Sequence, residues 1–155
     1  AIPSIASRVA LYHKVVAVLP ADRVARHRLV RELIEHGSFG DAEAEFKRAV
    51  DDDGLDPPLQ RYKVKVMLAR SRGEDMLPED RQALIRQAHW EAQQGVTRFA
   101  DSKYMFLALA DAAEEWRDVT GDDSMVEGAV QELRRAYSQL LDPMLQQRLV
   151  RLERA

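Results

Sequence analysis

The chain has 155 residues, the size of one ordinary domain, and its 46% hydrophobic and 32% charged residues with 7 glycines and 6 prolines are typical of a folded protein. It contains no cysteine, which excludes disulfide bonds, a thiolate nucleophile and cysteine-based metal sites. No uninterrupted apolar run in the sequence is long enough to cross a bilayer. The net charge of −3 combines a weakly basic first half with an acidic stretch at residues 101–127.

Apolar residues recur at helical spacing through the chain, and the first four predicted helices end at proline or glycine. The first helix repeats apolar residues every three or four positions, at Ile5, Val9, Tyr12, Val16 and Leu19. Pro20 stops this helix, Asp22 caps the second one, and Gly37 and Gly73 close the second and the fourth. These signals predict helices over about residues 4–19, 22–36, 41–53 and 57–72.

Four further helices are predicted in the second half of the chain. Pro78 opens a long fifth helix, Asp101 or Ser102 caps the sixth, and Pro143 starts the eighth. The predicted helices cover about residues 78–99, 102–120, 123–141 and 143–154. Eight helices joined by short turns leave no room for a sheet, and such connections pair consecutive helices antiparallel. We therefore expect an all-α fold.

The punctuation between helices recurs at a nearly constant interval. Gly37 and Gly73 are 36 residues apart, and Pro20 and Pro57 are 37 apart. A fixed period in this range is typical of stacked helix pairs, in which neighbouring pairs cover the apolar face that a single pair leaves open.

Residues 23–54 carry a more specific pattern. The packing positions of the first helix and of the turn after it hold Leu29, Val30, Leu33, Gly37 and Phe39. The second helix spaces a small, a large and a small residue, at Ala42, Phe46 and Ala49. A similar spacing returns later in the chain, at Ala129, Leu133 and Ala136. This pattern resembles the tetratricopeptide repeat (TPR), although Arg26 stands where that family prefers a large aromatic residue.

The resemblance implies a right-handed α-solenoid of antiparallel helix pairs with about seven or eight helices. We expect a single TPR-like domain over residues 1–155. Its parts would be a leading helix, three repeats of which the second and third are divergent, and a capping helix, at residues 1–20, 21–56, 57–100, 101–142 and 143–155.

Known catalytic and cofactor-binding motifs are missing from the sequence. The four histidines form neither the Glu-x-x-His pairs of di-iron bundles nor the His-Glu-x-x-His of zinc proteases. No serine lies in a Gly-x-Ser-x-Gly elbow, and no glycine-rich phosphate loop occurs. We therefore expect no catalytic residue, no metal and no cofactor.

Basic residues cluster on the second and fourth predicted helices. They are Arg23, Arg26, His27, Arg28 and Arg31 on the second, and Arg61, Lys63, Lys65, Arg70 and Arg72 on the fourth. A nucleic-acid-binding surface would favour exposed aromatic residues among such cations, but only Tyr62 is nearby, and the whole chain is acidic with a pI near 5.8. We expect no nucleic-acid partner.

In TPR stacks the first helix of each pair lines a groove that binds segments of partner proteins. Counting back from Gly37, Gly73 and Gly121, the resemblance implies that these residues bind a protein or peptide partner: His27, Arg31, Lys63, Met67, Arg70, Asp111 and Glu115. Such a groove would be basic at one end and acidic at the other, which would orient a ligand by charge. The chain has no asparagine, so we do not expect the asparagine clamp that some members of the family use on a partner's C-terminus.

We therefore expect a noncatalytic interaction scaffold or adaptor. Two alternatives remain open. Because the chain begins with alanine and its last helix runs to the end, we expect a piece of a longer chain, so the domain could be a regulatory or sensor arm of a membrane-anchored protein, an enzyme or a signalling ATPase. A helical enzyme that uses its carboxylates is the other alternative. The charged residues of the expected groove could also be ordinary solvated charges on a surface that contacts another domain of the same parent protein. The sequence leaves the partner, the oligomeric state and the compartment open.

Overall fold

The computed structural model describes residues 4–154 and confirms an all-α fold, with no strand in that range. The helices are α1 (Ile5–Val18), α2 (Arg23–His36), α3 (Phe39–Asp53), α4 (Pro57–Ser71), α5 (Pro78–Arg98), α6 (Lys103–Thr120), α7 (Ser124–Leu140) and α8 (Pro143–Arg154). The largest difference from the predicted boundaries is the start of α3, which begins at Phe39 rather than near Asp41.

Local signals in the sequence explain most of the helix ends. The Asp22 carboxylate accepts a hydrogen bond from the backbone N–H of Ala25 and so caps α2. Asp56 accepts one from the N–H of Leu59 and caps α4 in the same way. Gly37 and Gly121 end α2 and α6 in the left-handed conformation, with φ of 80° and 73°, which favours glycine.

The end of α4 differs from the other two. Arg72, not glycine, is its C-cap residue, and Gly73 has no positive φ. The N–H groups of Arg72 and Gly73 donate hydrogen bonds to the carbonyls of Ala69 and Arg70, respectively. Each bond spans three residues, as in a 3₁₀-helix, so the end of α4 is tighter than an α-helical turn. Gly73 therefore does not mark the same point of its helix as Gly37 and Gly121, and positions counted back from it fall on a different face.

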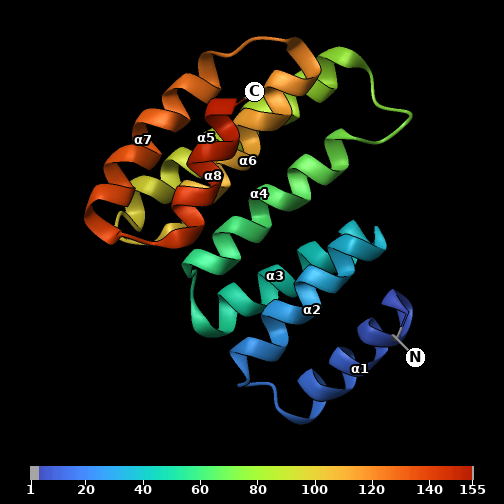
Figure 1. Ribbon diagram of the computed structural model, residues 1–155. Helices are drawn as coiled ribbons and strands as arrows, with labels where there is room; N and C mark the ends of the chain where they lie inside the picture. The colour runs from blue at the N-terminus through green and yellow to red at the C-terminus, as the bar shows by residue number, and fades with distance from the viewer. Residues whose placement is uncertain (1–3, 155) are drawn as a thin grey trace.

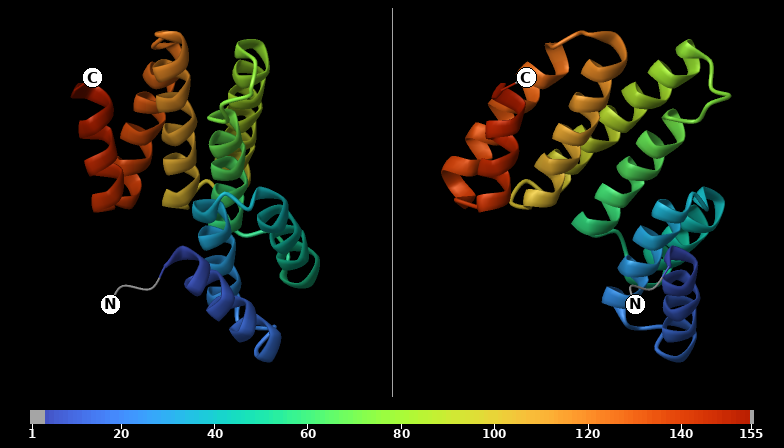
Figure 2. Two further views of the ribbon diagram at one scale, coloured as in Figure 1. Left: turned by 90° about the vertical axis from the view of Figure 1, so that its right-hand side faces the viewer. Right: turned by 45° about the vertical axis from the view of Figure 1, so that its right-hand side comes forward.

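The helices form a stack of antiparallel pairs. Each of α2, α4 and α6 contacts the helix that follows it in the chain, and α2, α4, α6 and α8 also form a row in which each contacts the next. Figure 1 shows α4 between α2 and α3 on one side and α5 to α8 on the other, and the two views of Figure 2 show α1 and α8 at opposite ends of the stack. This arrangement is that of an α-solenoid.

The core consists of two clusters that meet at α4. The larger one is built around α6, whose residues 105–110 are all buried, and extends from Val64 and Leu68 of α4 to Leu145 and Leu152 of α8. The smaller one joins Leu29 and Leu33 of α2, Ala42 of α3 and Val66 of α4, and partly buried side chains of α1 cover it. Two different faces of α4 therefore contribute to the two clusters.

The four alanines of the small-large-small patterns are buried between helices. Ala42, Ala49, Ala129 and Ala136 are at most 2% exposed, so α3 and α7 approach their neighbours closely. Phe46, between the first two alanines, is only partly buried. It lines a small hollow of about 150 Å³ between α2, α3 and α4, together with Tyr62, Val66 and Met67.

Among the described residues, α1 packs against α2 alone and has no buried residue. No helix between residues 4 and 154 has both the length and the apolar character that a membrane span requires.

Candidate functional site

The row of α2, α4, α6 and α8 presents a surface rich in charge, which we call the charged face. It consists of His27 and Arg31 of α2, Arg61, Lys65 and Arg72 of α4, Asp111, Glu114, Glu115 and Asp118 of α6, and Arg148 and Arg151 of α8. A hollow of about 350 Å³ lies within it, and the apolar part of its lining is Ile34, Leu68 and Ala69. The charged face therefore combines a depression, a patch of apolar surface and both signs of charge.

Arginines from two helices surround the carboxylates of α6. The Asp111 carboxylate accepts hydrogen bonds from Arg148 Nη1 on one oxygen, at 2.7 Å, and from Arg61 Nε on the other, at 3.4 Å. Both nitrogen–oxygen distances are within ion-pair range. Arg61 belongs to α4 and Arg148 to α8, so Asp111 connects three helices. The side chains of Arg148 and Asp111 are only 13% and 15% exposed, which reduces screening by water.

Two bidentate pairs extend this network along α6. Arg151 of α8 donates to both oxygens of Glu114, at 2.9 and 2.8 Å, and Arg72 of α4 donates to both oxygens of Glu115. The hydrogen bond to Glu115 raises the pKa of the Arg72 guanidinium. Three carboxylates of α6, those of Asp111, Glu114 and Glu115, are therefore paired with arginines, whereas the sequence suggested a groove with an open acidic end. Asp118, which also lines the hollow, has no ion pair within residues 4–154.

Some of the partner-binding residues expected from the sequence lie on the charged face. Asp111 and Glu115 are the paired carboxylates of α6, and Arg31 is exposed on α2. His27 lies at the edge of the face, where its Nε2 is 3.0 Å from Asp56 Oδ2, the carboxylate that caps α4. Arg23 donates to the same oxygen at 2.9 Å, so Asp56 links α2 to the start of α4.

The structure does not bring Lys63, Met67 and Arg70 onto the charged face. Lys63 pairs with Glu91 of α5 at 3.0 Å, Arg70 pairs with Glu43 of α3 at 3.2 Å, and Met67 lines the small hollow beside Phe46. These three side chains point toward the other layer of helices. Gly73, unlike Gly37 and Gly121, is not a left-handed cap, so the positions counted back from it do not correspond to those counted back from the other two glycines.

The charged face also contains residues that the sequence analysis did not select, namely Arg61, Lys65, Arg72, Glu114, Arg148 and Arg151. Asp111 and Glu114 are three residues apart on α6, and Arg148 and Arg151 are three residues apart on α8. Residues with this spacing lie on the same face of a helix. The matched spacing of opposite charges was therefore a signal that could have identified α8 as a partner of α6.

Lys65 differs from the other cations of the face. It is partly buried, it lines the hollow, and no carboxylate within residues 4–154 lies in ion-pair range of its ammonium group. Burial lowers the pKa of Lys65, and repulsion from Arg61, Arg148 and Arg31 lowers it further, while Asp111 opposes the effect. Asp111 is already held by two arginines.

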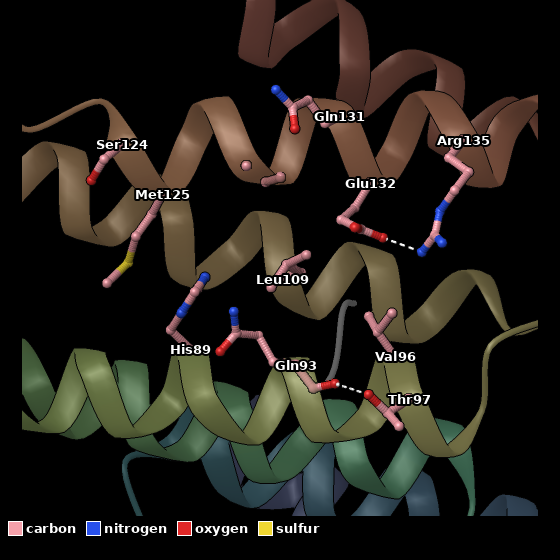
Figure 3. Close-up of a pocket in the computed structure, with 12 residues that line it drawn as sticks. His89, Gln93, Val96, Thr97, Leu109, Ser124, Met125, Gln131, Glu132 and Arg135 are labelled. Carbon is pink, nitrogen blue, oxygen red and sulfur yellow. Dashed lines mark hydrogen bonds and ion pairs between the residues drawn. The ribbon is translucent and has the colours of Figure 1, made fainter.

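A second depression, of about 510 Å³, lies on the other side of the stack between α5 and α7. Figure 3 shows His89, Gln93 and Thr97 of α5 facing α7 across Leu109 of α6. The two charged residues that line it, Glu132 and Arg135, pair with each other. Burial lowers the pKa of the His89 imidazole, which therefore stays neutral at lower pH than an exposed histidine. This cleft offers amides, hydroxyls and a neutral imidazole, and its charges are already satisfied.

Among residues 4–154, no three histidine, aspartate or glutamate side chains are grouped so that they could hold a metal ion. Comparison of the chain with protein-family models, with curated proteins and with solved structures gives no match.

Proposed function

We propose that the domain is a noncatalytic protein-interaction scaffold that binds a segment of a partner protein in the hollow of the charged face. The observation that carries this proposal is the hollow itself, which is formed by side chains of four helices, has an apolar patch and is surrounded by charged groups. Recognition of a peptide needs these features, because apolar contacts supply affinity and charges select the orientation.

Rigidity of the surface supports the same proposal. The buried residues of α6 pack against α4 and α8, and ion pairs from these two helices to α6, of which Arg148–Asp111 is the least exposed, join the helices around the hollow. A preformed surface loses little conformational entropy when a ligand binds. The helix stack would therefore act by presenting a fixed shape.

The pairing of the basic residues favours a protein partner over a nucleic acid. Arg23, Arg26, Arg61 and Arg72 each pair with a carboxylate on another helix or in the turn after one. Binding to phosphates would have to compete with those carboxylates. A single apolar patch flanked by paired charges is better suited to a polypeptide.

To test this function, short random peptides are selected for binding to the immobilised chain. The affinity of each selected peptide is then measured with a labelled copy of it. Ala69→Trp places a large side chain into the hollow, and Ala44→Trp makes the same change on an exposed position of α3. We expect Ala69→Trp to weaken binding at least about tenfold and Ala44→Trp to leave it within about twofold.

Two outcomes contradict this function. One is a selection that yields no peptide, or only peptides whose binding is insensitive to Ala69→Trp. The other is tight binding of a labelled single-stranded DNA that falls steeply with salt, as phosphate-driven binding does.

A further inference from the structure

The basic residues of α4 are paired in a regular way, with one exception. Arg61, Lys63, Arg70 and Arg72 each form an ion pair with a carboxylate of another helix, at distances of 3.4, 3.0, 3.2 and 2.7 Å. Lys65 has no such partner within the described part of the chain. Because every other cation of the cluster is matched, Lys65 is the position at which the pairing is left open.

The surroundings of Lys65 make this open position costly. Arg31, Arg61 and Arg148 all act on its ammonium group by repulsion, and Asp111 is the single carboxylate that attracts it appreciably. Asp111 already accepts bonds from Arg61 on one oxygen and from Arg148 on the other. An ammonium that is partly buried among cations gains more from a new carboxylate than an exposed lysine does, because less water screens the contact.

The lining of the hollow limits what the ligand can be. It contains three cations, Lys65, Arg72 and Arg151, and four carboxylates, which are those of Asp111, Glu114, Glu115 and Asp118. A phosphate with two negative charges would meet a lining with an excess of negative charge. A ligand with one carboxylate matches the one lining ammonium that has no ion pair within residues 4–154, whereas Asp118, the lining carboxylate without an ion pair there, would repel a ligand that carries more negative charge. The apolar residues Ile34, Leu68 and Ala69 provide a surface for an apolar side chain beside that carboxylate.

We propose that Lys65 is the anchor of the site and binds an aspartate or glutamate side chain of the partner segment, with a neighbouring apolar residue of that segment packed on Ile34, Leu68 and Ala69. This inference rests on the proposed function and adds the chemistry of the ligand. Lys65 thus selects acidic segments, while the paired arginines fix the shape of the site.

The test uses the peptides selected on the wild-type chain. Lys65→Met keeps the aliphatic stem and removes the charge, and Lys47→Met is the matched control, since Lys47 is exposed on α3 and has no ion-pair partner within residues 4–154. We expect Lys65→Met to weaken binding about tenfold and Lys47→Met to leave it within about twofold. Replacing the acidic residue of the peptide by its amide should weaken binding to the wild type equally, and should not weaken binding to Lys65→Met further.

A pH series provides a second readout. Binding requires the protonated ammonium, so the affinity of the wild type should fall as the pH rises through the lowered pKa of Lys65, while the affinity of Lys65→Met should not. Circular dichroism should show that Lys65→Met melts no lower than the wild type, because the change removes an unpaired charge from a partly buried site.

The outcomes separate this inference from the proposed function. Peptides that respond to Ala69→Trp but bind Lys65→Met within about twofold, or that carry no acidic residue, overturn the role of Lys65 and leave the binding site in place. Peptides that respond to neither change overturn both. Displacement of the peptide by millimolar inorganic phosphate would show a general anion site and would also overturn the inference.

Discussion

Gly95 of α5 lies close against side chains of α4 and α6. A Cβ atom at this position would clash with Met105 Sδ and would lie 3.2 Å from Gln60 Cγ. Met105 is fully buried, so its side chain has little room to move away. We expect Gly95→Ala to lower the free energy of unfolding by about 1–3 kcal/mol, despite the better helix propensity of alanine, as measured by urea denaturation.

Gly128 is the matched control for that change. It lies inside α7, is exposed, and has no heavy atom within 4 Å of the position that a Cβ would take. Gly128→Ala should therefore stabilise the protein by about 0.5–1 kcal/mol, through helix propensity alone. Equal effects of the two substitutions would mean that α5 is not packed against α6 as described.

His89 predicts a dependence of stability on pH. Burial lowers the pKa of its imidazole in the folded state, so the unfolded chain binds more protons between that lowered pKa and the ordinary value of 6.5. The contribution of His89 is therefore lost as the pH falls from 6.5 through the folded-state pKa. We expect His89→Gln to lose less thermal stability than the wild type on acidification from neutral pH to about pH 5.

His13→Gln provides the control for this experiment, because His13 is exposed on α1. Its melting temperature should follow that of the wild type through the same pH range. If His89→Gln and the wild type lose stability in parallel as the pH falls, the His89 imidazole is not buried as the structure describes.

Two arginines in different surroundings pair α8 with α6. Arg148 is 13% exposed and pairs with the partly buried Asp111, whereas Arg151 is 60% exposed. We expect Arg148→Met to lower the free energy of unfolding by about 1–3 kcal/mol, because Asp111 loses one of its two partners in a site with little water. Arg151→Met should cost less than about 1 kcal/mol, as for other exposed pairs. Urea denaturation of the two variants measures the difference, and a larger cost for Arg151→Met would contradict the description of this network.

The sequence predicted the elements more completely than the faces that they turn to one another. Helix ends such as Asp22, Gly37 and Gly121 depend on hydrogen bonds and φ angles within a few residues, so local signals reveal them. The orientation of α4 depends on contacts with α2, α3, α5 and α6, which are distant in the sequence. Lys63, Met67 and Arg70, which the resemblance assigned to a groove with Asp111 and Glu115, lie instead on the side of α4 that faces α3 and α5.

In the candidate site too, local features could be predicted from the sequence, whereas contacts between distant helices could not. Asp111 and Glu115 could be selected from one helix, because residues four apart share a face. That both are neutralised by arginines of α4 and α8 is a property of the stack, since the partners lie 37 to 50 residues away in the chain. Lys65 could not be distinguished from the neighbouring lysines and arginines until those pairings were known.

Within the stack, α4 joins two cores of unequal size. Val64 faces the larger cluster around α6 and Val66 faces the smaller one around α2, and both valines are at most 4% exposed. In a linear stack each unit contacts only its neighbours, so the end with less buried apolar surface opens first. We therefore expect the amides of α1 to α3 to exchange with solvent faster than those of α4 to α8.

The two valines of α4 test this order of opening by hydrogen exchange. Val66→Ala removes methyl groups from the smaller cluster. It should lower the free energy of opening of α2 and α3 by about 1–2 kcal/mol, because only the closed state of these helices contains the packing that is lost. Val64→Ala makes the same chemical change against the larger cluster, which stays intact when α1 to α3 open. It should therefore speed exchange in α5 and α6 and leave the opening of α2 and α3 nearly unchanged. Equal acceleration of all helices by either substitution would mean that the stack unfolds as one cooperative unit, and that α4 does not separate two cores.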